Sequence, residues 1–364
     1  MSWLLAFAGF ALLVILHELG HFAVAKWVGM RVEKFSLFFP PTLASRKVGE
    51  TEYAIGLIPA GGYVKISGMS PSEDLPDEVR TRAYHAQPVW KRMAVIAAGP
   101  AVNLIVAFVL LVLFFGLIGG QTEPVTAQVD KIERGYPAAE VLKPGDTLVS
   151  VDGIGGGTED LSRQISSHRC AQSPPTDGCR AAEPATLVID RGGKRVVERV
   201  APIYDAGTGV ERTRLGFSYV PGPRETLPFG EAVTTSLDRF WFITRETLSL
   251  PARIFDAERR KEISGIVGSY EVTRQTIIDD IADTVGILAI ISLSLAIVNL
   301  FPFLPLDGGH IFWAAVEKLR GGKPVPFSVM ERAGVVGFML VIGLFAIGLS
   351  NDIGRLSGEG FGVP

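Results

Sequence analysis

The residues most able to do chemistry together lie in the first apolar stretch of the chain, which contains His17-Glu18-Leu19-Gly20-His21. Residues four apart share one face of a helix, so both imidazoles can reach one metal ion. Glu18 is too close in sequence to serve easily as a third ligand, but its carboxylate can reach water at the ion. Zinc lowers the pKa of water that it binds to about 7, and a carboxylate can pass the released proton to a leaving amine. The pattern therefore predicts amide hydrolysis, with His17 and His21 as zinc ligands and Glu18 as acid and base.

The stretch that carries this pattern, from Trp3 to Ala25, contains no charged residue except Glu18. Ionisable groups inside a membrane cost a few kcal/mol and usually have a function. Three polar side chains satisfied by helix packing are the plain alternative. A secretory signal ending at Ala23-Val24-Ala25 is another, but no positive charge precedes the apolar run, so we expect the segment to be retained.

A catalytic zinc usually has three protein ligands and one open position. The other three histidines lie in polar loops or at a span boundary, so Asp307 is the better candidate for the third ligand. Pro302 and Pro305 disrupt helical hydrogen bonding before it, and Gly308 and Gly309 allow close backbone approach after it. We expect a bent, partly unwound segment that aims the carboxylate into the site, although an ordinary carboxylate at a helix end would fit the pattern too.

The elements that must position these residues are four stretches of about twenty uncharged residues, the length that a bilayer core requires. They are Trp3 to Ala25, interrupted only by Glu18, Met93 to Ile118, Val285 to Leu306 and Ala333 to Asn351. Lys and Arg concentrate in the loops after the first and third stretches, which predicts that both termini lie outside the cytoplasm. At 1.5 Å per residue His17 lies about 20 Å into the first span, and Asp307 ends the third, so both should lie toward the cytoplasmic leaflet.

The overall composition fits membrane segments joined to soluble ones. Of the 364 residues 48% are hydrophobic and 20% are charged, and the formal net charge is only -3. No run of Lys or Arg is dense enough to follow a phosphate backbone, so we expect membrane lipid but no nucleic acid as a partner.

These motifs resemble the site-2 protease family of intramembrane zinc metalloproteases, in particular its bacterial regulator-of-sigma-E-protease branch. The resemblance covers nearly the whole chain and rests on HELGH at 17 to 21, AAGPAVN at 97 to 103, NLFPFLPLDGG at 299 to 309 and a PDZ-like segment. It implies zinc binding by His17, His21 and Asp307, activation of water by Glu18, and contact of Asn299 with the substrate backbone. A simple packing role for the Asn299 amide stays open.

The loop after the first span has β-formers and glycines without a helical period. Its residues from about 50 to 70 look like the membrane-associated β-hairpin with which the family pairs an unwound substrate. An exposed strand edge could replace the hydrogen bonds that a substrate helix loses on unwinding. The residues expected to do so are Gly61, Gly62, Tyr63, Val64 and Lys65. An ordinary cytoplasmic hairpin is the alternative.

The segment from 119 to 220 resembles one PDZ domain, in which we expect a helix from Glu159 to Ser167 and a hairpin turning on Gly192-Gly193. The best-known family pattern has two such domains, but only about sixty residues follow before the third span, too few for a second copy. Gating of substrates by a PDZ pair is therefore in doubt. Cys170 and Cys179 fall in this extracytoplasmic segment, where a disulfide is permitted, and two unpaired thiols stay possible.

The connector from 221 to 284 carries Phe240-Trp241-Phe242 near Arg239 and Arg245. This amphipathic pattern suits a membrane surface, and an ordinary packed helix fits it equally well.

The sequence thus predicts a polytopic α-helical membrane protein of the bacterial inner membrane. Four transmembrane helices should carry a cytoplasmic-side β-hairpin and an inserted extracytoplasmic PDZ-like α+β domain. The expected domains are 1–118, 119–220, 221–284 and 285–364, of which the first and last hold the site. We expect a zinc metalloendopeptidase that cuts transmembrane segments of single-span proteins, such as anti-sigma factors or remnant signal peptides. A transporter and an inactive PDZ adaptor are less well supported, because the fourth span lacks polar residues and every expected site residue is present.

Overall fold

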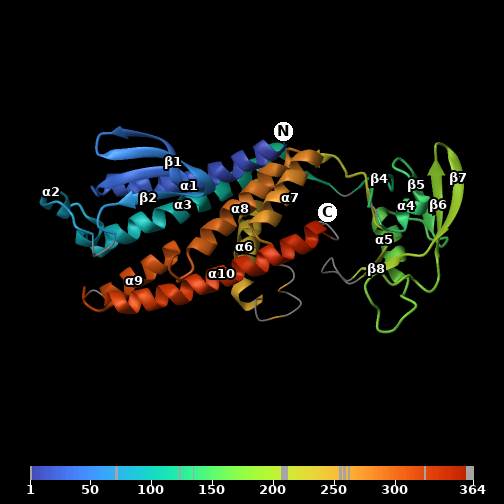
Figure 1. The fold of residues 1–364 in the computed structure, drawn as a ribbon. Coiled ribbons are helices and arrows are strands. Elements are labelled where there is room, and N and C mark those ends of the chain that lie inside the picture. The colour runs from blue at the N-terminus through green and yellow to red at the C-terminus, as the bar shows by residue number, and fades with distance from the viewer. Residues whose placement is uncertain are drawn as a thin grey trace. The chain divides into compact units, whose positions relative to one another are not determined.

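The computed structural model describes residues 2–69, 73–122, 124–133, 135–205, 212–253, 256, 260, 263–323 and 325–357. These residues form two compact units. Residues 2–117 and 227–356 make up the first unit, and residues 118–226 belong to the second. Figure 1 shows that the first unit contains the long helices and one β-hairpin.

Among the described residues, three helices of the first unit are long and apolar enough to cross a membrane. They are α1 (Ser2–Trp27), α3 (Val89–Leu113) with the π-helical turn Phe114–Ile118 that continues it, and α10 (Phe327–Ser357). Their apolar windows coincide with three of the four stretches that the sequence marked as spans. Uncharged runs of this length form helices here because a helix satisfies every backbone polar group internally.

The stretch predicted as the third span differs from the other three. Helix α8 (Asp283–Asn299) has 17 residues and is about 26 Å long, somewhat less than a bilayer core of about 30 Å. The chain leaves the helix after Asn299 and begins α9 (Asp307–Leu319) only at Asp307. The expected third stretch to Leu306 is therefore helical only as far as Asn299, and its last residues form the break expected around Pro302 and Pro305. Pro302 and Pro305 lie in the irregular part and have no N–H to continue the helical ladder.

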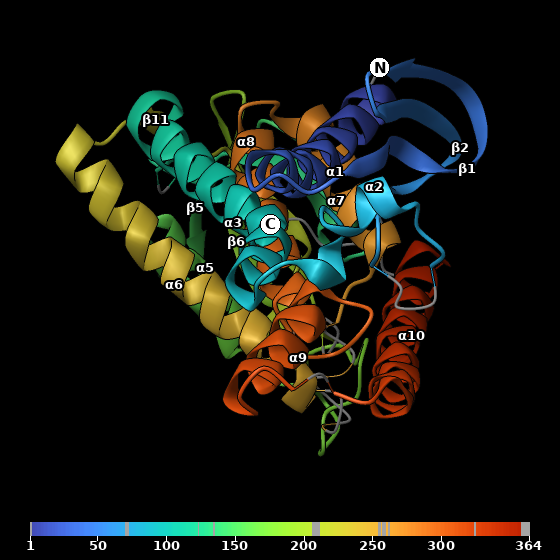
Figure 2. The ribbon, with the colours of Figure 1, turned by 90° about the vertical axis from the view of Figure 1, so that its left-hand side faces the viewer.

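Helix α3 is the centre of the first unit, since it packs against α1, α8, α9 and α6 (Phe229–Arg253). In Figure 2 it lies between α1 and α6. At Gly20 of α1, an added Cβ would lie 2.6 Å from the carbonyl oxygen of Ala98. The missing side chain therefore lets α1 and α3 approach closely enough to share one site.

The sequence left open whether the connector helix lies on the membrane or packs against the protein. Ile243 of α6 is buried against Ala107, Leu293 and Ile297, whereas Trp241 is 68% exposed. One face of α6 is thus packed and the other remains open. The connector continues with α7 (Ile266–Asp279), which packs against α1. Residues 254–255, 257–259 and 261–262 of the connector lie outside the described residues.

The hairpin is larger than the predicted range of 50 to 70, because its first strand was not foreseen. Strand β1 (Val32–Val48) pairs with β2 (Thr51–Ile66). Each of the two long strands pairs in two separate parts, so the sheet consists of four short runs. Residues 34–39 pair with 52–58 on one side, residues 32–37 pair with 62–66 on the other, and residues 42–48 pair with 51–56. Within the described part of the chain no further strand pairs with the outer side of 62–66, which is therefore an open sheet edge. The prediction missed β1 because its sequence lacks a regular alternation of apolar and polar residues.

Between this sheet and α3 lie two short turns of helix, Asp77–Arg80 (α2) and the 3₁₀ turn Tyr84–Ala86. Ser67 donates its N–H to the carbonyl oxygen of Arg31, and Tyr84 donates to that of Ser67. These bonds connect the end of the sheet to the segment that leads into α3.

The second unit is an α+β fold around one apolar core. The three-stranded sheet consists of β5 (Thr147–Val151), β6 (Ala185–Arg191) and β7 (Lys194–Val200). The remaining elements are short: β3 (Gly120–Gln121) with β11 (Arg224–Glu225), β4 (Val129–Ile132) with β10 (Phe217–Tyr219), β8 (Ile203–Asp205) with β9 (Arg212–Arg214), α4 (Ala138–Val141) and α5 (Thr158–Ser167). The helix expected at 159–167 and the hairpin turning on Gly192 and Gly193 are both present.

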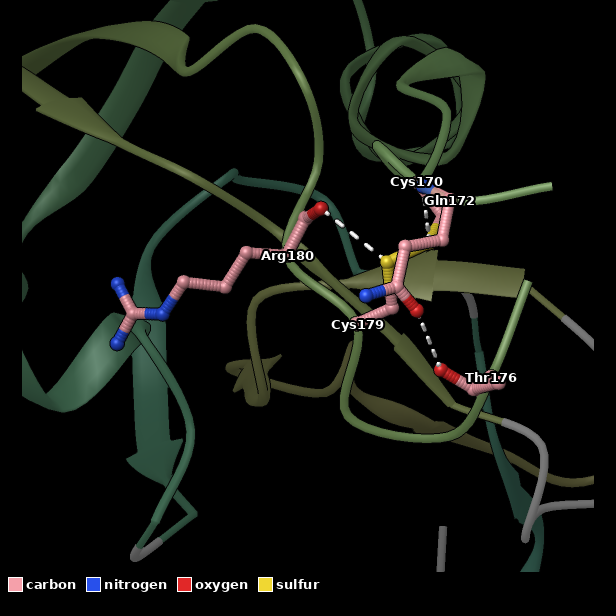
Figure 3. The surroundings of a disulfide bond; sticks show 5 residues. All are labelled: Cys170, Gln172, Thr176, Cys179 and Arg180. Atoms are coloured by element: carbon pink, nitrogen blue, oxygen red, sulfur yellow. Dashed lines mark hydrogen bonds between the residues drawn. A yellow bond between two sulfur atoms is a disulfide. The ribbon is translucent and has the colours of Figure 1, made fainter.

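An ion pair and a disulfide stabilise the second unit. Arg191 donates through Nε and Nη2 to both oxygens of the buried Asp146, at 2.8 and 2.7 Å. This guanidinium holds the pKa of the Asp146 carboxyl below its usual value, helped by the N–H of Lys143. In Figure 3 a disulfide joins Cys170 to Cys179, whose Cα atoms are 5.7 Å apart.

Candidate metal centre

Helix α1 places His17 and His21 one turn apart on its buried side. The two residues are only 7% and 8% exposed, and their Nε2 atoms are 3.3 Å apart. Both imidazoles therefore meet at one point beside α3, as the spacing of four residues predicts.

Asp307 reaches the same point from the first turn of α9. An added Cβ on Gly308 would lie 2.1 Å from the carbonyl oxygen of Leu300, and one on Gly309 would lie 2.5 Å from the backbone nitrogen of Leu304. Both positions must be glycine for the irregular segment to fold back over the start of α9. This turn brings Asp307 Oδ2 within 3.2 Å of His17 Nε2 and 3.3 Å of His21 Nε2.

The geometry of these three atoms fits a zinc ion. Ligands at about 2.0–2.1 Å from a tetrahedral ion are about 3.3 Å from one another, and the three observed separations are 3.2, 3.3 and 3.3 Å. Asp307 Oδ2 is buried and receives no hydrogen bond of acceptable geometry from the described residues. A buried carboxylate oxygen without a donor is costly unless a cation balances it. Among the described residues, no other group of His, Cys, Asp and Glu has this arrangement.

Contacts on the far side of His21 leave its Nε2 available for an ion. Its Nδ1 lies 2.8 Å from the carbonyl oxygen of Val95, which can only accept, so Nδ1 carries the proton and Nε2 keeps its lone pair. Gly99 gives the ring its space, because an added Cβ there would lie 2.2 Å from His21 Nε2.

A cavity of about 420 Å³ opens beside the three atoms and also contains Glu18. Most of the residues expected to contact a substrate line it: Asn299, Gly61, Gly62, Tyr63 and Val64. Lys65 is not among its lining residues, and its Nζ pairs instead with Glu33 Oε2 at 2.7 Å. Gly62 lies close to the glutamate, since an added Cβ would be 3.1 Å from Glu18 Cγ. The sheet edge and Glu18, the proposed general acid and base, therefore border the same cavity.

Several residues of the site were not singled out from the sequence. Phe39, Met69 and Ile96 line the cavity, and Val95 and Gly99 hold His21. The spacing of Gly99 and Asn103 within AAGPAVN contained a signal, because residues four apart on α3 face the two histidines four apart on α1. The cysteine pair lies in the second unit and has no part in this cavity.

Two histidines and a glutamate on a helix apolar enough to cross a membrane, joined by an aspartate from the short helix α9, form a site typical of a membrane metallopeptidase. The chain belongs to Peptidase family M50, the site-2 protease family, whose model matches residues 5–344. A relative from Brucella suis biovar 1 is 32% identical over 369 residues, which cover 93% of this chain and 92% of the relative. A relative from Clostridium perfringens is 31% identical, and the match covers 97% of this chain and 98% of the relative. A relative from Agrobacterium fabrum is 29% identical, and the match covers 96% of this chain and 94% of the relative.

All three relatives are named as zinc metalloproteases. Together with the family match, this identifies the chain as a zinc metalloprotease. Its three long apolar helices are consistent with the membrane location of the family.

Proposed function

We propose that this zinc metalloprotease hydrolyses peptide bonds within transmembrane segments of single-span membrane proteins. The observation that carries the proposal is the shared cavity, which is bordered by the metal-binding triad, Glu18 and an open strand edge. A soluble peptide would not need a site between helices that are apolar enough to enter a bilayer.

The proposed roles follow from the contents of the cavity. His17, His21 and Asp307 hold the zinc ion, which when bound supplies a Lewis acid that polarises the scissile carbonyl group and acidifies water. Glu18 takes a proton from the attacking water and delivers it to the nitrogen of the leaving amine. Asn299 lies in the same cavity at the end of α8, where its amide can bond to substrate backbone.

The open edge at residues 62–66 addresses a difficulty that every intramembrane protease has. The backbone amides of a helical substrate are bonded to one another, and unwinding would leave them unsatisfied in an apolar medium. A substrate strand added beside 62–66 would recover hydrogen bonds from this edge. The cut bond would then lie next to Gly62 and Glu18, which are already close to each other.

Cross-linking tests where the substrate lies. In a Glu18→Gln background, Val64→Cys should form a disulfide with cysteines near the middle of a single-span substrate's apolar segment, because Val64 lines the cavity. The matched control is Ser45→Cys, which lies on the opposite edge of the same sheet and should not react. Non-reducing gels of reconstituted membranes would show the adducts. Equal reaction at both edges, or cleavage by the active enzyme only outside the apolar segment, would contradict the proposal.

We further propose the topology expected from the distribution of Lys and Arg. Helices α1, α3, α8 and α10 cross the bacterial inner membrane, with residues 300–306 extending the short third crossing. Both termini and the second unit, as a PDZ-like domain, lie outside the cytoplasm, where the oxidising compartment suits the disulfide. Anti-sigma factors and remnant signal peptides are the substrate types that such a topology suits.

Accessibility of introduced cysteines tests this orientation. Glu78 and Lys194 are both exposed, one between α1 and α3 and the other in the second unit. A membrane-impermeant maleimide added to intact spheroplasts should label Lys194→Cys, whereas Glu78→Cys should react only after the membrane is opened. The opposite pattern would reverse the topology.

A further inference from the structure

The inference concerns the nitrogen of His17 that faces away from the metal centre, and it rests on the proposed centre. His21 has a carbonyl partner for its Nδ1, but the partner of His17 Nδ1 is the side-chain amide of Asn103, whose Nδ2 lies 3.4 Å away. Asn103 is 0% exposed. Its Oδ1 is buried without a hydrogen-bond partner among the described residues.

The orientation of this amide determines which nitrogen of His17 can bind an ion. If Nδ2 donates to Nδ1, a neutral imidazole must carry its proton on Nε2, the atom 3.2 Å from Asp307 Oδ2. An Nε2 that carries a proton has no lone pair for a metal. Rotating the amide by 180° exchanges its oxygen and nitrogen with little other movement. The oxygen would then accept the proton of Nδ1 and leave the Nε2 lone pair free.

The position of Asn103 suits this role. It follows Gly99 by one turn of α3. Asn103 therefore faces His17, and Gly99 faces His21. Its own carbonyl oxygen accepts a 2.9 Å hydrogen bond from Ser292 of α8. The amide is therefore held where three helices meet, and rotation about its terminal bond is the simplest movement left to it.

We propose that Asn103 is a positioning residue that sets the tautomer of His17. In the zinc-loaded enzyme its amide oxygen accepts from Nδ1–H and directs the Nε2 lone pair toward the ion. In the metal-free protein the reversed amide donates to Nδ1, and the proton of the neutral ring lies on Nε2. The same ring position is thus kept in both forms.

Zinc affinity, measured by chelator competition on the purified full chain in detergent, tests the proposal. Asn103→Leu keeps the volume but removes the acceptor, and should weaken zinc binding by about 10- to 100-fold, the usual effect of losing such a partner. Asn103→Asp supplies an acceptor in either orientation and should stay within about threefold of the wild type, a smaller change than losing the acceptor would cause. Asn351→Leu is the control, because that amide donates to the carbonyl oxygens of Arg260 and Ile263, outside the cavity, and its loss should leave zinc affinity unchanged.

Wild-type zinc affinity in Asn103→Leu would overturn the proposal, and so would equal loss in the leucine and aspartate variants. If the leucine variant does not fold, ¹⁵N NMR of the wild-type chain labelled at its five histidines decides the question. With zinc bound, His17 Nδ1 should be protonated, and an unprotonated Nδ1 would overturn the assignment. Failure of the wild-type chain to bind zinc at all would instead refute the proposed metal centre.

Discussion

Glu18→Gln should lower kcat for a single-span substrate by about 10²- to 10⁴-fold, the usual contribution of a general acid and base. Glutamine has nearly the same shape as glutamate but cannot take a proton from water or return it to the leaving amine. Glu18 lines the cavity without belonging to the three-atom group that could hold a metal ion, so zinc content should not change. Substrate cleavage in proteoliposomes and zinc content by atomic absorption are the two measurements.

The control for this prediction is Glu78→Gln, an equivalent change at an exposed glutamate of α2. It should retain full activity. Wild-type turnover in Glu18→Gln would show that another group moves the proton, and loss of zinc from that variant would place Glu18 among the ligands instead.

Gly99→Ala should remove most of the bound zinc, with a loss of affinity of at least about 100-fold, the upper end of what a displaced supporting group causes. The added methyl group would lie 2.2 Å from His21 Nε2 and 2.6 Å from its Cε1. Neither side can easily give way, because Val95 holds the ring and the close contact of Gly20 with Ala98 fixes α1 against α3. The imidazole must therefore turn away from the position at which it could bind an ion.

Gly343→Ala in α10 is the matched control, since an added Cβ there meets nothing within 4 Å. It should leave zinc binding unchanged and stabilise the helix by up to about 1 kcal/mol. Chelator competition and thermal unfolding in detergent would compare the two variants. Wild-type zinc affinity in Gly99→Ala would mean that His21 does not occupy this position in the loaded enzyme.

The chain encodes the parts of the site that depend on local geometry. His17 and His21 share a face because a helix has 3.6 residues per turn, and the apolar run around them makes their function plausible. Asp307 could be named as the third candidate because the prolines and glycines around it predict a local break in the helix. The observed segment between Asn299 and Asp307 is such a break.

Only the tertiary structure decided which groups surround these residues. His21 and its carbonyl partner Val95 are 74 residues apart in the chain, and His17 and Asn103 are 86 apart. No local period encodes such pairs, because they depend on how closely two helices approach and at what rotation. The same holds for the sheet, in which residues 62–66 form an outer edge beside the cavity although the Lys65 side chain within this edge pairs with Glu33. The sequence by itself determined the candidate ligands and the acid and base, and helix contact and strand register determined the groups that orient them.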